Sequence, residues 1–181
     1  MLTLPSLIPL IRDEFNVGID TLGFVVSISA LFFGLGAIPA GWIDRYLGKK
    51  RLLMIYQLGS AISALIIVFS PYFFSLVLGL SFMGLFCSIY HPTGLTLISQ
   101  RISNVSRGMA VHGMFGSMGS ALGPLSAVLI AGLFSWRYSY LFLGLLNIIL
   151  CVITYLLISP GEQMKSKIDD KSKVIRSEFL K

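Results

Sequence analysis

Long apolar runs alternate with short charged islands along this chain. Residues 21–43 contain no Asp, Glu, Lys or Arg, and neither does the 49-residue block 52–100. A helix needs about 20 apolar residues to cross a bilayer, so this block is long enough for two crossings. The turn sequence Ser-Pro-Tyr at 70–72 lies in its middle and divides it. The pattern predicts an all-α fold, that of a polytopic helical membrane protein.

Six spans follow from this division, and the first of them is partial. We expect them at residues 1–11, 21–43, 52–69, 73–98, 108–135 and 138–159. Residues 1–11 supply about half of a crossing before the charged triplet at 12–14. Prolines at positions 5 and 9 are expected to kink this first segment. The predicted organisation is one transmembrane bundle over residues 1–159 with an incomplete first helix.

Basic residues are distributed unevenly over the segments between these spans. On this topology twelve of the fourteen Lys and Arg side chains fall on one side, and Arg12 and Arg137 on the other. Lys and Arg resist translocation, so the basic side is expected to be cytoplasmic. Residues 160–181 carry six of the twelve and are expected to form a cytoplasmic tail or interdomain linker.

Composition supports a membrane protein and argues against a nucleic-acid partner. The 181 residues are 55% hydrophobic and 12% charged, whereas a soluble domain is about 25% charged. The basic residues behind the net charge of +6 lie in gaps between apolar runs and form no continuous patch. Cys87 and Cys151 fall inside apolar runs, where a small buried residue is the simpler interpretation than half of a disulfide.

Small and polar residues form a stripe along the fourth expected span. They recur at spacings of three and four, which places them on one helix face: Ser81, Gly84, Cys87, Ser88, His91 and Gly94. Pro92 has no amide hydrogen, so it leaves the carbonyl of Ser88 unpaired beside His91. The stripe predicts a local polar position inside the membrane.

The fifth expected span has a stronger stripe of small residues. Gly113, Gly116, Gly119 and Gly123 lie within about a third of the helix circumference. Pro124 follows them and is expected to bend the helix. Close helix packing with a kink explains these residues most simply, because faces of small residues are common in membrane helices.

Two histidines are the ionisable side chains that lie inside the spans and away from their ends. A residue of this kind within the membrane is a candidate functional residue, and a histidine changes charge near neutral pH. We therefore regard His91, His112, Ser88 and Tyr90 as candidates for a substrate or proton pathway. Alternatively, each histidine is neutral and donates one hydrogen bond to a freed carbonyl.

The sequence offers no motif for enzymatic chemistry. It has no metal-ligand cluster, no phosphate-binding glycine loop after a strand, and no nucleophile with a plausible base. An intramembrane enzyme built on His91 and His112 would need a third polar partner within the spans. We therefore expect no metal, no cofactor and no enzymatic activity.

These features resemble the N-terminal six-helix half of a transporter of the major facilitator superfamily, over essentially the whole chain. The residues that carry the resemblance are the charged loop Gly41–Arg51, Arg107-Gly108, the run Gly119–Pro124, His91-Pro92 and Trp136-Arg137. The resemblance implies a six-helix bundle of this type. It also implies that spans one, two, four and five line a central path.

Conformational roles are implied by the same resemblance. Asp44 and Arg45 would belong to a gate that engages a helix end or a neighbouring helix in one conformation and releases it in the other. The residues assigned to gating and conformational change are Asp44, Arg45, Lys49, Lys50, Arg51, Gly119, Gly123 and Pro124. Topological anchoring by the three basic residues at 49–51 is compatible with this role.

The sequence departs from the pattern of the family in three features. Two residues, Tyr46 and Leu47, separate Arg45 from the next glycine, where the family usually has one. Ala127 and Val128 replace two further glycines of the antiporter signature, and residue 80 is Leu where an Arg is often found. The resemblance therefore implies transport without specifying proton-coupled drug antiport.

The sequence predicts a secondary transporter that moves a small solute across a prokaryotic plasma membrane by alternating access. Its expected partners are the solute, the lipid bilayer and the missing second half of the transporter. Whether transport of the solute is coupled to protons is left open. As an isolated half it is expected to be inactive. The alternative is a small non-transporting membrane module of helices that self-associates or binds a partner.

Overall fold

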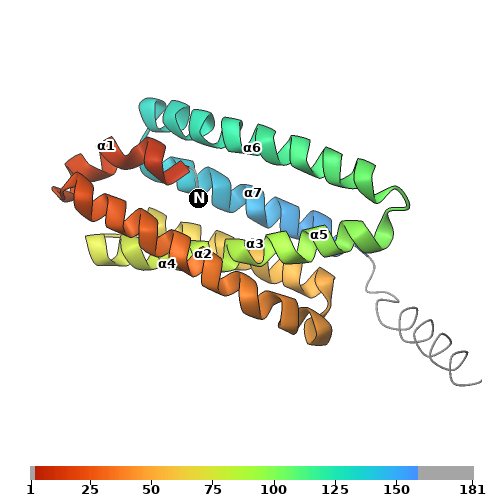
Figure 1. The fold of residues 1–181 in the computed structure, drawn as a ribbon. Helices are drawn as coiled ribbons and strands as arrows, with labels where there is room; N and C mark the ends of the chain where they lie inside the picture. The colour runs from red at the N-terminus through yellow and green to blue at the C-terminus, as the bar shows by residue number, and fades with distance from the viewer. Residues whose placement is uncertain (1–2, 159–181) are drawn as a thin grey trace, which may run out of the picture.

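The computed structural model describes residues 3–158, and these residues form seven helices without a strand (Figure 1). The helices are α1 (Thr3–Phe15), α2 (Ile19–Leu47), α3 (Lys49–Val68), α4 (Phe73–Ser88), α5 (Tyr90–Arg101), α6 (Val105–Leu133) and α7 (Trp136–Leu157). The predicted all-α class is confirmed. The expected tail at 160–181 lies outside the described residues.

Five stretches of the described chain are long and apolar enough to cross a membrane. They are Ile19–Asp44, Lys49–Val68, Phe73–Arg101, Val105–Leu133 and Trp136–Leu157. The 13 residues of α1 are about 20 Å long at 1.5 Å per residue, which is short of a hydrocarbon core about 30 Å thick. The fold is therefore a helical membrane bundle that contains one short helix.

The fourth expected span, 73–98, is divided into α4 and α5. The break falls at Ile89, whose amide donates to the carbonyl of Phe86, three residues back, at 3.2 Å. Pro92 follows in the first turn of α5 and has no amide to donate. The two helices still form one continuous stretch, Phe73–Arg101, that is long enough to span.

Short turns with local caps join the helices. Gly48 connects α2 to α3 with φ of 75°, a conformation that favours glycine. Asn104 caps α6, because its side-chain oxygen accepts from the amide of Arg107 at 3.0 Å. Ser135 caps α7 in the same way, accepting from the amide of Arg137 at 3.4 Å.

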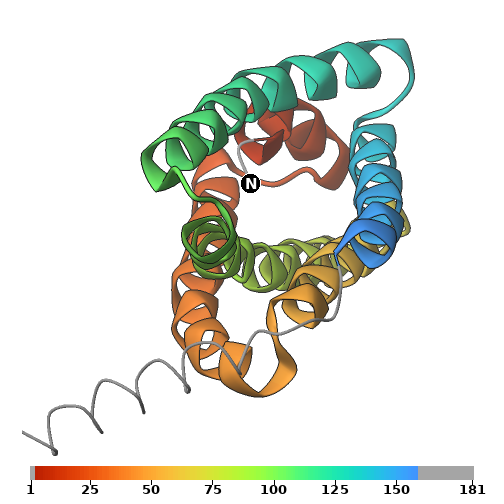
Figure 2. The ribbon, with the colours of Figure 1, turned by 90° about the vertical axis from the view of Figure 1, so that its right-hand side faces the viewer.

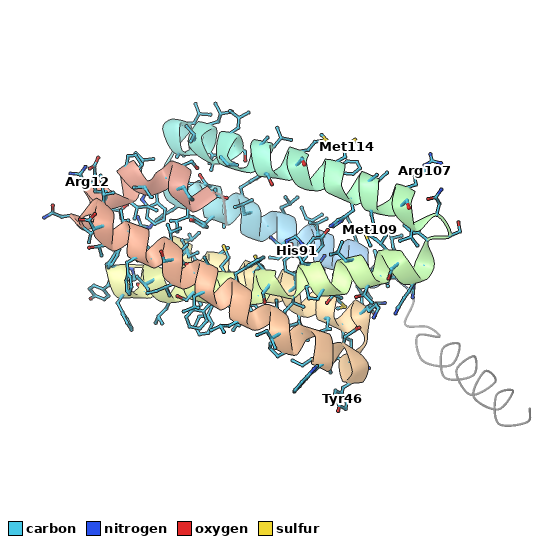
Figure 3. The ribbon with its side chains drawn as sticks, viewed as in Figure 1. Arg12, Tyr46, His91, Arg107, Met109 and Met114 are labelled. Carbon is cyan, nitrogen blue, oxygen red and sulfur yellow. The ribbon has the colours of Figure 1, made fainter. Side chains whose placement is uncertain are left out.

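The turns gather at two ends of the bundle. Figure 1 shows the α2–α3 turn, the α5–α6 turn and the last turn of α7 at one end, which we call the basic end. The α1–α2, α3–α4 and α6–α7 turns lie at the opposite end. In Figure 3, Tyr46 and Arg107 lie near the basic end and Arg12 lies near the opposite end.

The hydrophobic core lies toward the opposite end, around α1. It joins α1, α2, α3, α4, α6 and α7 through Leu4, Leu7, Ile11, Leu22, Val25, Ala64, Ile67, Leu76, Leu80, Met83, Ala127, Trp136 and Tyr140. Viewed along the bundle, α1 lies beside α6, while α2, α3 and α4 form the other side (Figure 2). The short first helix therefore fills the core at one end of the bundle.

Candidate functional site

A central hollow of about 1220 Å³ is surrounded by side chains from all seven helices. Its wall includes Thr3 of α1, Ala30 and Phe33 of α2, Tyr56 and Ser60 of α3, Cys87 of α4, Tyr90 and His91 of α5, residues 112–124 of α6 in part, and Leu143 and Asn147 of α7. No Asp, Glu, Lys or Arg is among the described residues of this wall. The hollow therefore suits a neutral or aromatic occupant better than a strongly charged one.

Tyr90 is the centre of an aromatic and polar cluster in this wall. Its hydroxyl lies 3.4 Å from Nδ1 of His112, a contact whose donor depends on the histidine tautomer. The ring of Tyr56 lies 5.3 Å from that of Tyr90, and the ring of His91 lies 5.5 Å from it. His91 also meets Phe33 edge to face at 5.9 Å. We call these five residues the Tyr90 cluster.

The Tyr90 cluster brings together three of the four residues expected in a substrate or proton pathway. His91 and His112 come from α5 and α6, and Figure 3 shows His91 in the interior of the bundle. Ser88 does not line the hollow. It is fully buried against α2, where its hydroxyl donates to the carbonyl of Leu85 at 2.6 Å.

The glycines of α6 face the hollow. Gly113, Gly116, Gly119 and Gly123 all line it, together with Pro124. A Cβ added at any of these four glycines would meet nothing within 4 Å. The opposite face of α6 is large and apolar, with exposed Met114, Phe115, Met118, Leu122 and Leu125. The small face lines the hollow, and the large face is suited to lipid.

At the basic end, Asp44 forms an ion pair with Lys49 across Gly48. The Lys49 side chain is 7% exposed and that of Asp44 is 19% exposed, so the pair is largely removed from solvent. The expected gate residue Arg45 lies in α2, and its side chain is outside the described part of the chain. The ion pair fastens the end of α2 to the start of α3.

The other two basic residues of this turn have different surroundings. Lys50 donates from Nζ to the carbonyl of Tyr155 at 2.7 Å and lies 4.8 Å from the centre of that ring. It therefore connects the start of α3 to the last turn of α7. Arg51 is exposed.

Three polar or aromatic residues of the wall, Phe33, Tyr56 and Asn147, are among those that the sequence did not mark as candidates. Tyr56 and Phe33 belong to the Tyr90 cluster, and a single aromatic residue inside an apolar run gives no signal of such a role. Asn147 recurs with Gly144, Cys151 and Thr154 at spacings of three and four along α7, a pattern that packing explains equally well. Its amide nitrogen donates to the carbonyl of Leu143 at 2.9 Å, while its Oδ1 has no partner among the described residues.

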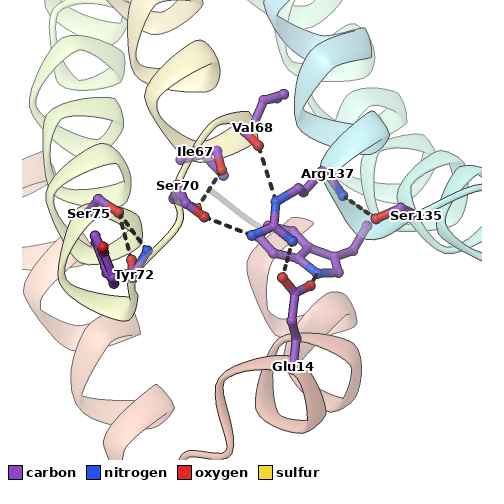
Figure 4. A network of polar contacts seen from close by, with 9 residues as sticks. Glu14, Ile67, Val68, Ser70, Tyr72, Ser75, Ser135 and Arg137 are labelled. Carbon is purple, nitrogen blue, oxygen red and sulfur yellow. Dashed lines mark hydrogen bonds and ion pairs between the residues drawn. The ribbon is translucent and has the colours of Figure 1, made fainter.

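A polar clamp closes the opposite end of the bundle (Figure 4). Arg137 forms an ion pair with Glu14, and its guanidinium donates to the carbonyls of Val68 at 3.1 Å and Ser70 at 2.8 Å. Trp136 donates from its indole nitrogen to the same Glu14 carboxylate at 2.6 Å. We call Glu14, Trp136 and Arg137 the clamp, because they join α1, the α3–α4 turn and α7.

The charge of Glu14 is stabilised by this clamp. Burial acts to raise the pKa of its carboxyl group. Hydrogen bonds from Arg137 and Trp136, with the charge of Arg137, outweigh burial and place the pKa of this carboxyl group below its ordinary value. The carboxylate is therefore ionised, and the clamp intact, at neutral pH.

The fold and the hollow define this chain as an integral membrane protein of several spans, with a polar cluster inside the bundle. The sequence profile of the Major Facilitator Superfamily matches residues 1–180. The chain belongs to the Major Facilitator Superfamily.

Curated relatives agree with this family. Quinolone resistance protein NorB of Staphylococcus aureus, in strains JH9, Newman and JH1, is 29% identical to this chain over 167 residues. The alignment covers 91% of this chain and 35% of the relative. The chain therefore spans about a third of the length of the relatives it matches.

Proposed function

We propose that this chain is one six-helix body of a secondary transporter, which moves a small solute by alternating access together with a second body. The solute path passes the Tyr90 cluster. The basic end and the C-terminus face the cytoplasm of a prokaryotic cell, because Lys and Arg resist translocation. On its own the chain does not complete a transport cycle.

The observation that carries this proposal is the Tyr90 cluster itself. Two histidines and two tyrosines from three helices meet inside the bundle. Polar groups are costly inside a membrane unless they face water, protein or a ligand. Their placement on the wall of a 1220 Å³ hollow fits a solute that offers both a ring and a hydrogen-bonding group.

A flat aromatic solute fits this wall best. Ring contacts among Phe33, Tyr56, Tyr90 and His91 provide faces and edges for stacking. The relatives are named for quinolone resistance, and a quinolone is a flat bicyclic aromatic. We therefore take a fluorescent quinolone as the first solute to test. Proton coupling through His112 is a further part of the proposal, because its Nδ1 lies 3.4 Å from the hydroxyl of Tyr90 in the wall of the hollow.

Binding to the purified chain in lipid nanodiscs tests the solute path. Tyr90→Ala should weaken quinolone binding about fivefold, since an aromatic contact contributes about 1 kcal/mol beyond its buried area. The matched control is Tyr46→Ala, which removes an exposed tyrosine at the basic end outside the hollow and should leave binding unchanged. Equal affinity of the Tyr90→Ala variant and the unmodified chain would remove the cluster from the path.

The α2–α3 turn is the proposed gate. Asp44→Asn removes the charge that pairs with buried Lys49, so the turn should lose its fixed geometry. In a longer chain that contains both bodies, this variant should insert normally and transport slowly. Normal flux of the Asp44→Asn variant in proteoliposomes would exclude the gating role.

Self-association without transport is the second candidate function, and the open glycine face of α6 favours it. The mass of the chain in detergent and its solute flux in liposomes separate the two functions. A monomer that binds quinolone without flux supports a transporter body. A stable dimer without quinolone binding supports the self-associating module.

A further inference from the structure

A second, smaller cavity lies beside the central hollow, within the hydrophobic core. It measures about 190 Å³ and is bordered by α1, α2, α4 and α7. Three residues, Thr3, Ala30 and Met83, belong to both walls and so lie between the two spaces. The remaining wall residues line this cavity and not the central hollow: Leu4, Pro5, Val26, Ser29, Leu80 and Tyr140. We call this space the core cavity.

Two hydroxyl groups in the wall of the core cavity have unused hydrogen-bonding capacity. Ser29 of α2 is 2% exposed and Tyr140 of α7 is 1% exposed. Neither hydroxyl has a partner among the described residues, whereas the hydroxyl of buried Ser63 donates to the carbonyl of Gly59 at 2.7 Å. A buried hydroxyl without a partner is costly. Both groups are therefore suited to a ligand that brings a hydrogen-bonding partner into the cavity.

The surroundings of Tyr140 fix the position of its hydroxyl. Its ring meets that of Trp136 edge to face at 6.1 Å, and Trp136 is itself bonded to Glu14 in the clamp. Because Tyr140 is fully buried, its hydroxyl cannot reach solvent by a small rotation. A partner for this hydroxyl must therefore come from the core cavity.

The rest of the wall is mainly apolar, and this limits what fills the cavity. A water molecule takes up about 30 Å³ and needs two to four polar partners when it is buried. A cavity of 190 Å³ corresponds to about six waters, which is more than the hydroxyls of this wall can support. An apolar protein cavity of about 150 Å³ binds benzene. The core cavity therefore has the size for one aromatic ring that carries a hydroxyl.

We propose that the core cavity binds a small, neutral, phenol-like molecule. Its ring packs against the apolar wall, and its hydroxyl bonds to those of Tyr140 and Ser29. A rigid ring loses less conformational freedom on binding than a flexible alcohol of the same size. The exposed wall residues Pro5 and Ala30 mark the edge at which this molecule enters.

This inference goes beyond the proposed transport function and does not depend on it. The residues of the Tyr90 cluster do not line the core cavity, so a ligand in this cavity leaves the solute path free. Such a ligand contacts α1, α2, α4 and α7 together. Because it binds the folded chain, it should also raise the thermal midpoint as its concentration rises.

Two probes that differ by one hydroxyl test the site. 4-Fluorophenol and fluorobenzene are each titrated against the 181-residue chain in detergent and followed by fluorine NMR. 4-Fluorophenol should bind saturably and about fivefold more tightly than fluorobenzene, the factor that one net hydrogen bond contributes. Binding without a saturable component would overturn the inference, because partition into detergent does not saturate. Equal affinities of the two probes would overturn it as well.

Removal of the two hydroxyls tests the hydrogen bonds. In the double variant Ser29→Ala with Tyr140→Phe, the ring at position 140 remains and both hydroxyls are lost. The fivefold preference for 4-fluorophenol should disappear, while fluorobenzene should bind as before. The matched control is Ser27→Ala with Tyr138→Phe, which removes two exposed hydroxyls from the same two helices and should keep the preference. The same preference in both double variants would contradict the site.

Filling the core cavity gives a second readout. Val26→Phe adds bulk to its wall and should abolish saturable binding of both probes; full binding by a folded Val26→Phe variant would contradict the site. The two double variants decide the matter if Val26→Phe does not fold. Weaker 4-fluorophenol binding in Tyr90→Ala, with no change in the Ser29 and Tyr140 double variant, would place the probe in the central hollow and overturn the inference. No quinolone and no flux is measured, so failure of the transport proposal is distinguishable from failure of this one.

Discussion

The α3 side and the α6 side of this bundle are built from similar residues and packed in opposite ways. Half of the residues in the most apolar stretch of α3 are buried, whereas 6% of the residues in the corresponding stretch of α6 are buried. Both sides carry glycines, among them one on each of α2, α3 and α4 on the packed side and four on one face of α6. Those at 36, 59 and 79 lie against neighbouring side chains, whereas those at 113, 116, 119 and 123 face the hollow.

The difference shows that a stripe of small residues allows another helix to approach closely. The stripe does not determine which helix does so. On the packed side, α2, α3, α4 and α7 supply one another with partners, and buried groups pair between them: Gln57 of α3 donates to the hydroxyl of Thr154 of α7 at 2.9 Å. On the α6 side, the corresponding space is the hollow. The predictions below test this contrast.

Loss of the clamp should have the largest effect. Arg137→Ala removes the ion pair to Glu14 and two hydrogen bonds to the α3–α4 turn. Hydrogen bonds to charged groups contribute about 1.5–3 kcal/mol, so we expect a loss of about 3 kcal/mol in unfolding free energy in detergent. The control is Arg12→Ala, an exposed arginine at the same end, which should change stability little. Similar stability of both variants would show that the clamp does not hold the packed side together.

Alanine at a packed glycine should have the next largest effect. In Gly36→Ala the new methyl lies 2.8 Å from Cδ1 of Leu85 and 3.0 Å from its carbonyl, so overpacking should cost about 2 kcal/mol. Gly116→Ala meets open space and should be neutral or gain about 0.5–1 kcal/mol, because alanine favours the helix. Thermal unfolding of the two variants in the same detergent measures the contrast. Equal destabilisation would mean that α6 is packed after all.

A smaller effect should follow from breaking the polar contact between α3 and α7. Gln57→Leu removes the donor to Thr154 and should cost about 1 kcal/mol. On the α6 side, the hydroxyl of Ser120 bonds only within its own helix, to the carbonyl of Gly116 at 2.9 Å. Ser120→Ala should therefore leave the unfolding midpoint unchanged. A larger loss from Ser120→Ala than from Gln57→Leu would reverse the comparison.

The smallest effect should be a dependence on acid. Because the pKa of Glu14 is lowered in the fold, its contribution to stability is complete above its unfolded pKa of about 4.3. The contribution is lost as the pH falls through the lower folded value. The unfolding midpoint, followed from pH 7 to pH 3, should fall more steeply below about pH 4.3 in the unmodified chain than in the Glu14→Gln variant. Parallel curves would show that Glu14 carries no such linkage.

The sequence predicts structural features that depend on residues close together in the chain. It does not predict contacts between residues that are far apart in the chain. Apolar runs predicted the helical membrane class, because crossing a bilayer requires a local property of about 20 residues. The clamp was not predicted, because Glu14 is 122 residues away from Trp136 in the sequence.

The candidate site shows the same limit. Glycine spacing placed Gly113, Gly116, Gly119 and Gly123 on one face of α6, and that face lines the hollow. The same kind of spacing placed Ser88 with His91, yet the helix break at Ile89 separates them, and Ser88 turns to α2. Tyr56 joins the Tyr90 cluster from α3, a contact set by the packing of whole helices and not by any local pattern.

Thiol labelling of two engineered cysteines, one on the packed α3 side and one on the α6 side, tests the difference between these sides most directly. The same experiment tests the solute path. Ser63 of α3 is fully buried and Ser120 of α6 lines the hollow, and each hydroxyl bonds to the carbonyl four residues back. In a background with Cys87→Ser and Cys151→Ser, Ser120→Cys should react with a water-soluble maleimide about tenfold faster than Ser63→Cys, because reaction requires access. A saturating quinolone should slow the reaction at position 120 and leave position 63 unchanged. Equal rates at the two positions, or a rate at position 120 that does not respond to quinolone, would contradict an open, solute-accepting hollow.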